Sequence, residues 1–152
     1  MKAKTLRHII NLWPPLFFNA IKVTRISDNF REVDVTLKLR WFNRNNVRTQ
    51  FGGNLFAMTD PWYMLMLMEN LGRDYYVWDK KASIDFISPG RNNVTAKFIL
   101  TEEKITEIRV ATASGEKYLP EFVVEIYGAD QVLVAKVHRT VYVKRKNNRR
   151  IS

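Results

Sequence analysis

The sequence predicts a single α+β domain in which a curved antiparallel sheet wraps around one long buried helix. Two observations carry this prediction. The elements occur in the order β-β-α-β-β-α-β-β, and the strands alternate apolar and polar residues. The segment from about 53 to 71 is apolar on nearly all sides, which is typical of a helix enclosed by the rest of the fold.

The other elements follow from periodicity and from turn residues. Strands show a period of two, whereas helices place apolar residues three and four positions apart. In chain order we expect a short amphipathic helix over about 3–13, strands over 17–26 and 33–40, the central helix, strands over 75–87 and 94–100, a helix over 102–113, and strands over 122–126 and 133–143. Pro14-Pro15 should end the first helix and Gly72 the central one.

The chain, residues 1–152, reads as one domain. Its length suits a single core, and no linker or internal repeat divides it. Lys and Arg cluster from about 144 to 152, where a solvated basic tail is expected. The net charge of +10 attracts polyanions, such as nucleic acid, acidic lipid or a small molecule that carries phosphate.

Composition excludes several classes of function. Without Cys there is no disulfide scaffold, thiolate metal site or Cys nucleophile, and His8 and His138 alone cannot form a multi-His metal site. No apolar run reaches the ~20 residues that a membrane span needs. Aromatic residues do not alternate with Lys and Arg as in nucleic-acid binders. We therefore expect a cytoplasmic protein with no metal or cofactor, and with neither nucleic acid nor a membrane as partner.

Asp60 is the anomaly in the apolar segment, where it is flanked by Met58 and Trp62. A buried carboxylate costs several kcal/mol unless it is paired or hydrogen-bonded, so a catalytic role is one interpretation. The other is structural, because Asp60-Pro61 also fits an N-cap followed by proline at the first helical position. Both hold if a helix that starts near Gly53 is kinked at Pro61.

Polar groups at the start of the central helix are a second candidate. Backbone N–H groups at Gly52-Gly53 could stabilise an oxyanion, although the pair also suits a tight turn into the helix. Asn45 and Asn46 could orient a water or a substrate carbonyl, although they are also ordinary turn residues.

Several motifs taken together resemble the hotdog-fold thioesterases related to the phenylacetate-pathway enzymes. The run from Asn45 to Asp60, with Phe51-Gly52-Gly53 and Met58-Thr59-Asp60-Pro61, is similar to the helix entry of that superfamily. Within it, the likeness is to a bacterial branch that has Phe-Gly-Gly at this entry. Further matches to that branch are Trp78-Asp79-Lys80, the Ile-x-Phe-x-x-Pro-Gly of residues 84–90, and residues 111–117.

This resemblance implies a hotdog fold, a homodimer or homotetramer, and an acyl-CoA substrate bound at the dimer interface. Asp60 would be the general base or nucleophile, and Gly52 would donate the oxyanion contact. Asn45 would position the thioester or the water from the facing subunit.

The resemblance also implies substrate contacts at Gly53 and Phe51. Because the protein is strongly basic, Arg91, which follows Pro89-Gly90, is a candidate contact for a phosphate of coenzyme A. Phe51 stands where better-known relatives have His, and it cannot form a hydrogen bond. The sequence therefore predicts an acyl-CoA thioesterase and leaves one alternative, a non-catalytic protein that binds acyl-CoA or an acyl carrier.

Overall fold

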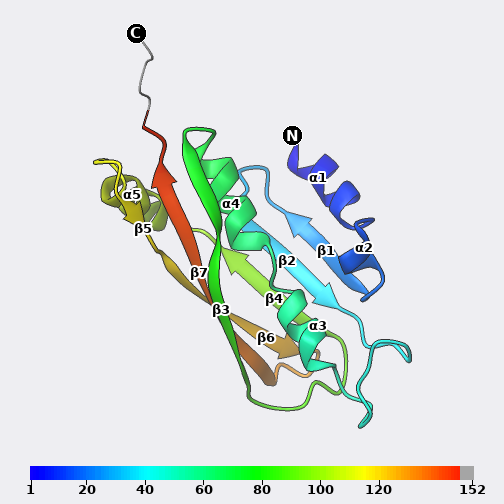
Figure 1. Ribbon diagram of the computed structural model, residues 1–152. Helices are drawn as coiled ribbons and strands as arrows, with labels where there is room; N and C mark the ends of the chain where they lie inside the picture. Colours follow the sequence, from blue (N-terminus) through cyan, green and yellow to red (C-terminus); the bar gives the residue numbers. More distant parts are fainter. Residues whose placement is uncertain (148–152) are drawn as a thin grey trace.

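The structure, a computed structural model, describes residues 1–147. It contains one antiparallel sheet of seven strands in the order β1-β2-β4-β6-β7-β3, with β5 paired to β7 (Figure 1). The strands are β1 (Ile21–Ile26), β2 (Glu32–Leu37), β3 (Tyr75–Phe86), β4 (Val94–Ile99), β5 (Lys117–Tyr118), β6 (Glu121–Gly128) and β7 (Leu133–Arg145). The helices are α1 (Ala3–Ile10), α2 (Pro14–Phe17), α3 (Gly52–Ala57), α4 (Trp62–Leu71) and α5 (Glu102–Ala111).

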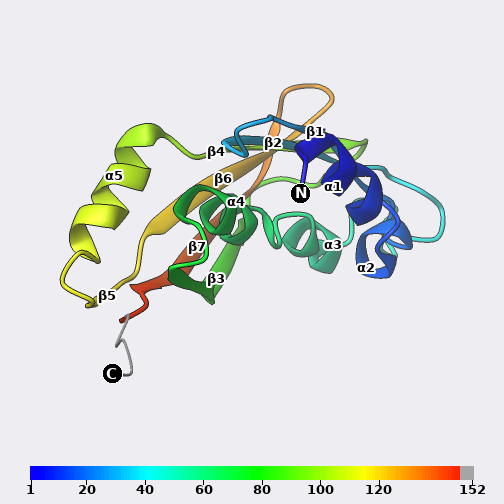
Figure 2. The same ribbon diagram turned by 90° about the horizontal axis from the view of Figure 1, so that it is seen from above.

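The sheet curves around the two helices of the central segment. Seen from above, the strands form an arc with α3 and α4 inside it, while α1 and α2 lie beyond them beside β1 (Figure 2). Within residues 1–147, no helix combines the length and the apolar character that a bilayer crossing requires. The arrangement confirms the predicted α+β fold class.

The core lies between the concave face of the sheet and α4. Trp62, Met66 and Leu67 on this helix are almost fully buried. Tyr63 stacks on Phe122 of β6 with ring centroids 4.2 Å apart, and burial raises the pKa of its hydroxyl to about 12. Because the sheet surrounds the helix, its apolar residues find partners on nearly every side, as their distribution around the helix predicts.

The central helical segment is interrupted rather than continuous. α3 ends at Ala57 and α4 begins at Trp62, with residues 58–61 in turns between them. Pro61 has no N–H to donate to a carbonyl of the preceding turn, so the hydrogen-bond ladder stops there. The N-cap position of α4 is Pro61, and among the described residues no side chain forms a capping hydrogen bond there, so the interpretation of Asp60 as an N-cap is wrong.

The first and last elements of the chain begin or end at other residues than the sequence predicts. α1 stops at Ile10, and Pro14-Pro15 opens the short helix α2, because proline is well accommodated at the first helical positions. The first strand therefore starts at Ile21 instead of 17. At the other end β7 continues through Arg145, so the predicted tail begins later, and its residues 148–152 lie outside the described part of the chain.

A register shift in β3 changes which side chains face inward. The pairing with β7 passes from Asp79↔Val141 to Lys81↔Thr140, which leaves Lys80 as an extra residue. A strict period of two places Trp78 on the same face as Ala82, but the shift puts them on opposite faces. Trp78 stacks on Tyr142 at 4.1 Å on the exposed face, and its neighbour Asp79 points inward.

Candidate functional site

Arg139 is a buried cation that faces the break in the central helix. Only 4% of the residue is exposed, and it lies on β7 in register with the core residues Val137 and Val141. Its Nη2 donates to Asp60 Oδ2 at 2.9 Å, and its Nη1 donates to the hydroxyl of Thr59 at 3.0 Å. The guanidinium thus fixes the turn between α3 and α4 to the sheet.

Asp79 completes the cluster from the neighbouring strand. Its Oδ2 lies 3.7 Å from Arg139 Nη2, and within residues 1–147 its buried Oδ1 has no hydrogen-bond partner. Burial raises the pKa of the Asp79 carboxyl; the charge of Arg139 opposes this rise and the charge of Asp60 adds to it. One guanidinium therefore interacts with two carboxylates. Of these, the carboxylate of Asp79 is the less exposed to solvent.

The carboxylate of Asp60 is accessible. Its side chain is 56% exposed, so the apolar surroundings that the sequence suggests do not enclose it within this chain. The adjoining apolar side chains of Met58 and Trp62 turn into the core instead. Arg139 holds Oδ2, and no hydrogen bond to Oδ1 is found within residues 1–147. Asp60 is thus oriented by a buried cation and can reach a ligand from outside.

The start of α3 forms one wall of a cleft of about 390 Å³. The cleft is lined by Asn45, Thr49, Gln50, Gly52, Leu55 and residues 86–90. A Cβ on Gly52 would lie 2.9 Å from Cζ of Phe86, and a Cβ on Gly53 would lie 2.5 Å from Cε1 of Phe51. The aromatic rings of Phe86 and Phe51 therefore pack directly against the backbone of the two glycines, and a side chain at either position would displace a ring.

The amide of Asn45 is committed to its own loop. Its Nδ2 donates to Thr49 Oγ1 and to the Gln50 carbonyl, while its Oδ1 accepts from the N–H groups of Val47 and Thr49. Two donors and two acceptor positions are the full capacity of an asparagine amide. These contacts favour the interpretation of Asn45 as a turn residue that shapes the cleft.

The sequence-predicted residues fall into two groups within one chain. Asn45 and Gly52 line the cleft, whereas Asp60 belongs to the Arg139 cluster and is not among the cleft residues. Phe51 is the exposed N-cap residue of α3, and Gly53 follows in its first turn. Arg91 is exposed just beyond the cleft wall that ends at Gly90.

Sequence reasoning missed Arg139 and Asp79, although a signal for Arg139 was present. Arg139 falls between Val137 and Val141 in the inward parity of its strand, and a lone cation in that register indicates a buried partner. Asp79 shows no such signal, because it faces inward only through the register shift at Lys80. Within residues 1–147 no group of three or more His, Cys, Asp or Glu side chains could hold a metal ion.

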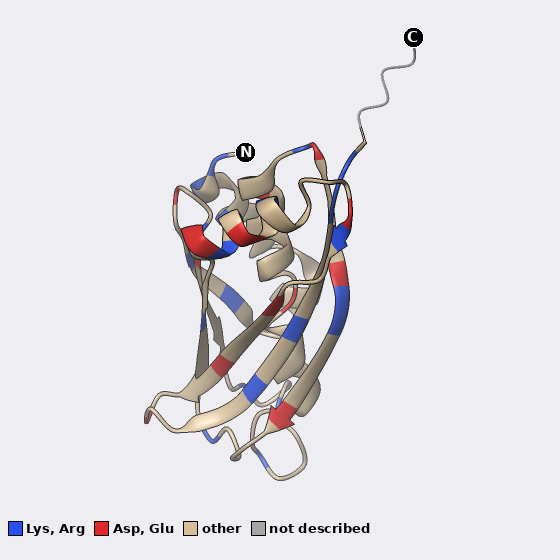
Figure 3. Ribbon diagram, turned by 90° about the vertical axis from the view of Figure 1, so that its left-hand side faces the viewer, with Lys and Arg blue, Asp and Glu red and all other residues tan. Residues whose placement is uncertain are grey.

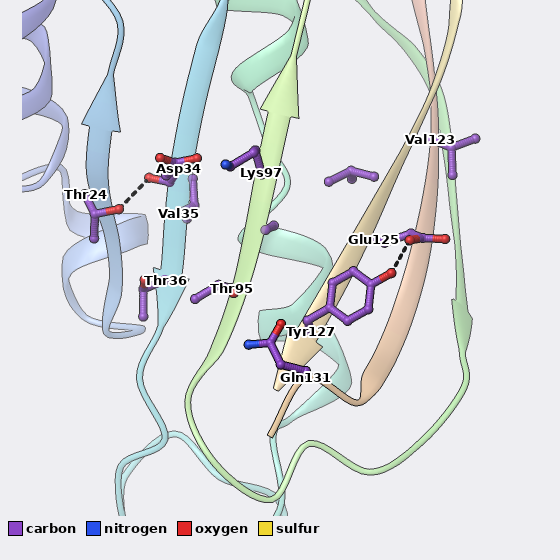
Figure 4. A pocket seen from close by; sticks show the side chains of 12 residues that line it. Thr24, Asp34, Val35, Thr36, Thr95, Lys97, Val123, Glu125, Tyr127 and Gln131 are labelled. Carbon is purple, nitrogen blue, oxygen red and sulfur yellow. Dashed lines mark hydrogen bonds between the residues drawn. The ribbon is translucent and has the colours of Figure 1, made fainter. Parts of the chain in front are cut away.

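A larger hollow of about 630 Å³ lies on the outer face of the sheet, away from both groups (Figure 4). Asp34, Lys97 and Glu125 project around it, and Tyr127 donates a hydrogen bond to Glu125. It lies where β4 and β6 diverge after only three paired positions.

Comparisons with known proteins relate the chain to one family and to several solved structures. The sequence profile of a family described as "Domain of unknown function (DUF4442)" matches residues 2–143. No curated protein matches the chain.

Among solved structures, a Pseudomonas aeruginosa protein of unknown function, described as a probable thioesterase, superposes with a TM-score of 0.83 at 13% identity, over 95% of this chain and 97% of its own. A Haemophilus influenzae thioesterase gives 0.69 at 12% identity, over 99% and 95%. The PaaI protein of the Escherichia coli phenylacetic acid degradation operon gives 0.61 at 14% identity, over 93% and 91%. These similarities establish the hotdog fold.

Proposed function

The chain belongs to the DUF4442 family and has the hotdog fold, and from this premise we propose that it hydrolyses an acyl thioester of coenzyme A. The observation that carries the proposal is the half-exposed carboxylate of Asp60, held at the break in the central helix by the buried cation of Arg139. Thioesterases among the solved structures of the same fold support it. The absence of Cys accords with the cytoplasmic location that we also propose.

In the proposed reaction Asp60 Oδ1 takes a proton from a water molecule. The oxygen of this water attacks the thioester carbonyl, and the backbone N–H of Gly52 donates a hydrogen bond to the oxyanion that forms. The C–S bond then breaks, the thiol leaves with the proton, and a carboxylic acid remains. Arg139 keeps the carboxylate of Asp60 oriented throughout, because the guanidinium is itself held by its hydrogen bond to Thr59 and by its position on β7.

Two subunits would bring these groups together. In one chain Asp60 and Gly52 belong to separate clusters, so we propose that Asp60 acts opposite the Gly52 cleft of a partner subunit. The strand β3, twelve residues long, ends the sheet order and has β7 as its only partner within residues 1–147. A long open edge is a ready surface for pairing with a second copy, as a dimer or within a tetramer.

The positive charge of the protein suits the phosphates of coenzyme A. Arg91 is exposed beside the cleft that holds Gly52, so we propose it as one phosphate contact. Phe51, also exposed at the helix entry, would contact the substrate through its ring alone.

The test is release of free thiol from a panel of acyl-CoA esters of different chain length and head group. Asp60→Asn keeps the shape and can still accept a hydrogen bond from Arg139, but it removes the base. Turnover should fall by roughly 10²-fold or more. Asp85→Asn, an exposed carboxylate on the outer face of β3, is the matched control and should retain full turnover. Equal rates for Asp60→Asn and the wild type would refute the proposed role.

A second candidate function is binding of acyl-CoA or an acyl carrier without hydrolysis. It is favoured by Phe51, which offers no hydrogen bond at the helix entry, and by the engagement of Asp60 Oδ2 with Arg139. Saturable binding of acyl-CoA by calorimetry, with no thiol released by the wild type, would establish this function instead.

A further inference from the structure

Large apolar side chains are exposed together at one end of the molecule. Six of them, which we call the aromatic end, are Leu12, Trp13, Phe17, Phe18, Trp41 and Phe42. Their exposed fractions range from 47% for Trp13 to 80% for Trp41. Single exposed apolar residues are ordinary, whereas a contiguous group usually marks an interaction surface.

Hydrogen bonds hold the two segments of the aromatic end beside each other. The side chain of Asn43 donates to the carbonyls of Asn19 and Lys38, both at 2.9 Å. The N–H of Lys38 donates to the carbonyl of Ala20 at 3.0 Å. The end of α2 and the loop after β2 are therefore neighbours, as both views show (Figures 1 and 2).

The segments that carry the aromatic end contain cations and no anions. Residues 1–27 and 35–59 include no Asp or Glu, but residues 35–59 alone hold Lys38, Arg40, Arg44 and Arg48. The acidic residues between these segments lie at the opposite end of the β1–β2 hairpin, where Glu32 pairs with Arg25. Other acidic residues gather on α5 at the far side of the sheet (Figure 3).

We propose that the aromatic end docks on the surface of a membrane that contains anionic lipids. Trp and Phe side chains favour the boundary between headgroups and acyl chains, and cations beside them are attracted to anionic headgroups. Next to Trp13, α1 and α4 border an open hollow of about 570 Å³ that is lined by apolar residues, including Leu6, Leu65 and Pro61. The exposed carboxylate of Asp60, which precedes Pro61, is paired with the cation of Arg139. This contact is peripheral and needs no spanning helix, and it revises the expectation from the sequence that no membrane is a partner.

The charge pattern argues against a second copy of the chain as the occupant. A two-fold interface through the aromatic end would place its cations opposite the same cations of the partner. An anionic surface has the complementary charge. The inference does not depend on thioester hydrolysis, because membrane docking and turnover involve different residues.

The test is co-sedimentation of the full chain with phosphatidylcholine vesicles, with and without phosphatidylserine. We expect binding to the anionic vesicles only, and weaker binding as salt rises. Arg40→Glu/Arg44→Glu should weaken this binding at least about tenfold. Lys97→Glu/Lys117→Glu makes the same change in net charge on other faces and should bind like the wild type.

The apolar contribution is tested separately. Trp41→Ser/Phe42→Ser should lose binding at least about tenfold, whereas Ile99→Ser/Val110→Ser, which removes exposed apolar groups elsewhere, should keep it. Thermal unfolding followed by circular dichroism verifies that each variant is folded.

Results of three kinds would overturn the proposal. The first kind shows no dependence on the local charge: equal binding to neutral and anionic vesicles, or equal loss of binding in the two charge variants. The second is a lower mass by light scattering for Trp41→Ser/Phe42→Ser, together with no vesicle binding by the wild type, which would identify a second copy as the occupant. The third is binding to a single-stranded oligonucleotide without binding to vesicles.

Discussion

Replacing Arg139 with Met should lower the free energy of unfolding by about 3 kcal/mol at pH 7. Met keeps most of the apolar length of the side chain, so the loss comes from the guanidinium. The hydrogen bond to Thr59 contributes about 1 kcal/mol. The pair with Asp60 contributes at most about 1 kcal/mol, because that carboxylate is half exposed and regains water. The remainder, about 1–2 kcal/mol, is the cost of leaving the carboxylate of Asp79, whose side chain is 24% exposed, without a counter-charge.

Adding Asp79→Asn to the same variant separates these contributions. The amide removes the uncompensated charge, so the double variant should recover about 1–2 kcal/mol relative to Arg139→Met alone. The assay is urea unfolding at a fixed protein concentration, with equal m-values as the criterion that the folded states are comparable. Arg139→Lys should fall between the wild type and Met, since a single ammonium cannot satisfy Thr59 and Asp60 as the guanidinium fork does.

Two outcomes would refute this reasoning. If Arg139→Met lies within about 0.5 kcal/mol of the wild type, the cluster contributes nothing measurable to stability. If the double variant is no more stable than the single one, the unpaired charge of Asp79 is not the main cost.

Three further predictions follow from the same structure. Because burial raises the pKa of Asp79, the folded chain holds this proton more tightly than the unfolded one. Stability therefore falls as pH rises from the ordinary Asp pKa of 3.8 through the raised pKa of the folded state. Asp79→Asn should therefore gain stability relative to the wild type across that window in urea titrations, whereas the exposed control Asp74→Asn should show no gain. Tyr63 should stay un-ionised in the folded protein until about pH 12 in ultraviolet difference spectra, and Tyr63→Phe should remove that late step. Light scattering should give at least twice the monomer mass, and a value near 17.9 kDa at micromolar protein would contradict pairing through β3.

Periodicity predicted the fold well because most strands have one buried face. The alternation of Val33, Val35 and Leu37 matches their burial in β2, and the all-round apolar segment is indeed enclosed by the sheet. Where the period of two fails, as at Trp78, the cause is an extra residue in the ladder. Such a bulge depends on the pairing with β7, which local sequence does not encode.

The candidate site was predicted only in part. Both Asp60 and Gly52 have signals in the local sequence. Asp60 is a charged residue in an apolar run, and Gly52 belongs to a pair of glycines. Arg139 lies 79 residues beyond Asp60 in the chain, and only the packing of the helix break against β7 reveals their contact. The exposure of Asp60 also depends on tertiary structure, because the turn at residues 58–61 swings its side chain out while Met58 and Trp62 point inward.

The short pairing between β4 and β6 is the weakest seam of the sheet, and we expect the strands on its two sides to open as separate cooperative units. β2 and β4 share six registered positions and β6 and β7 share seven, but β4 and β6 share only three. Beyond these three pairs, the ring of Tyr63 bridges the halves: it packs against Phe98 of β4 at 5.4 Å and against Phe122 of β6 at 4.2 Å. Native-state hydrogen exchange would then report a partial opening along this seam, with amides of the β4–β6 ladder exchanging before those of the β3–β7 ladder.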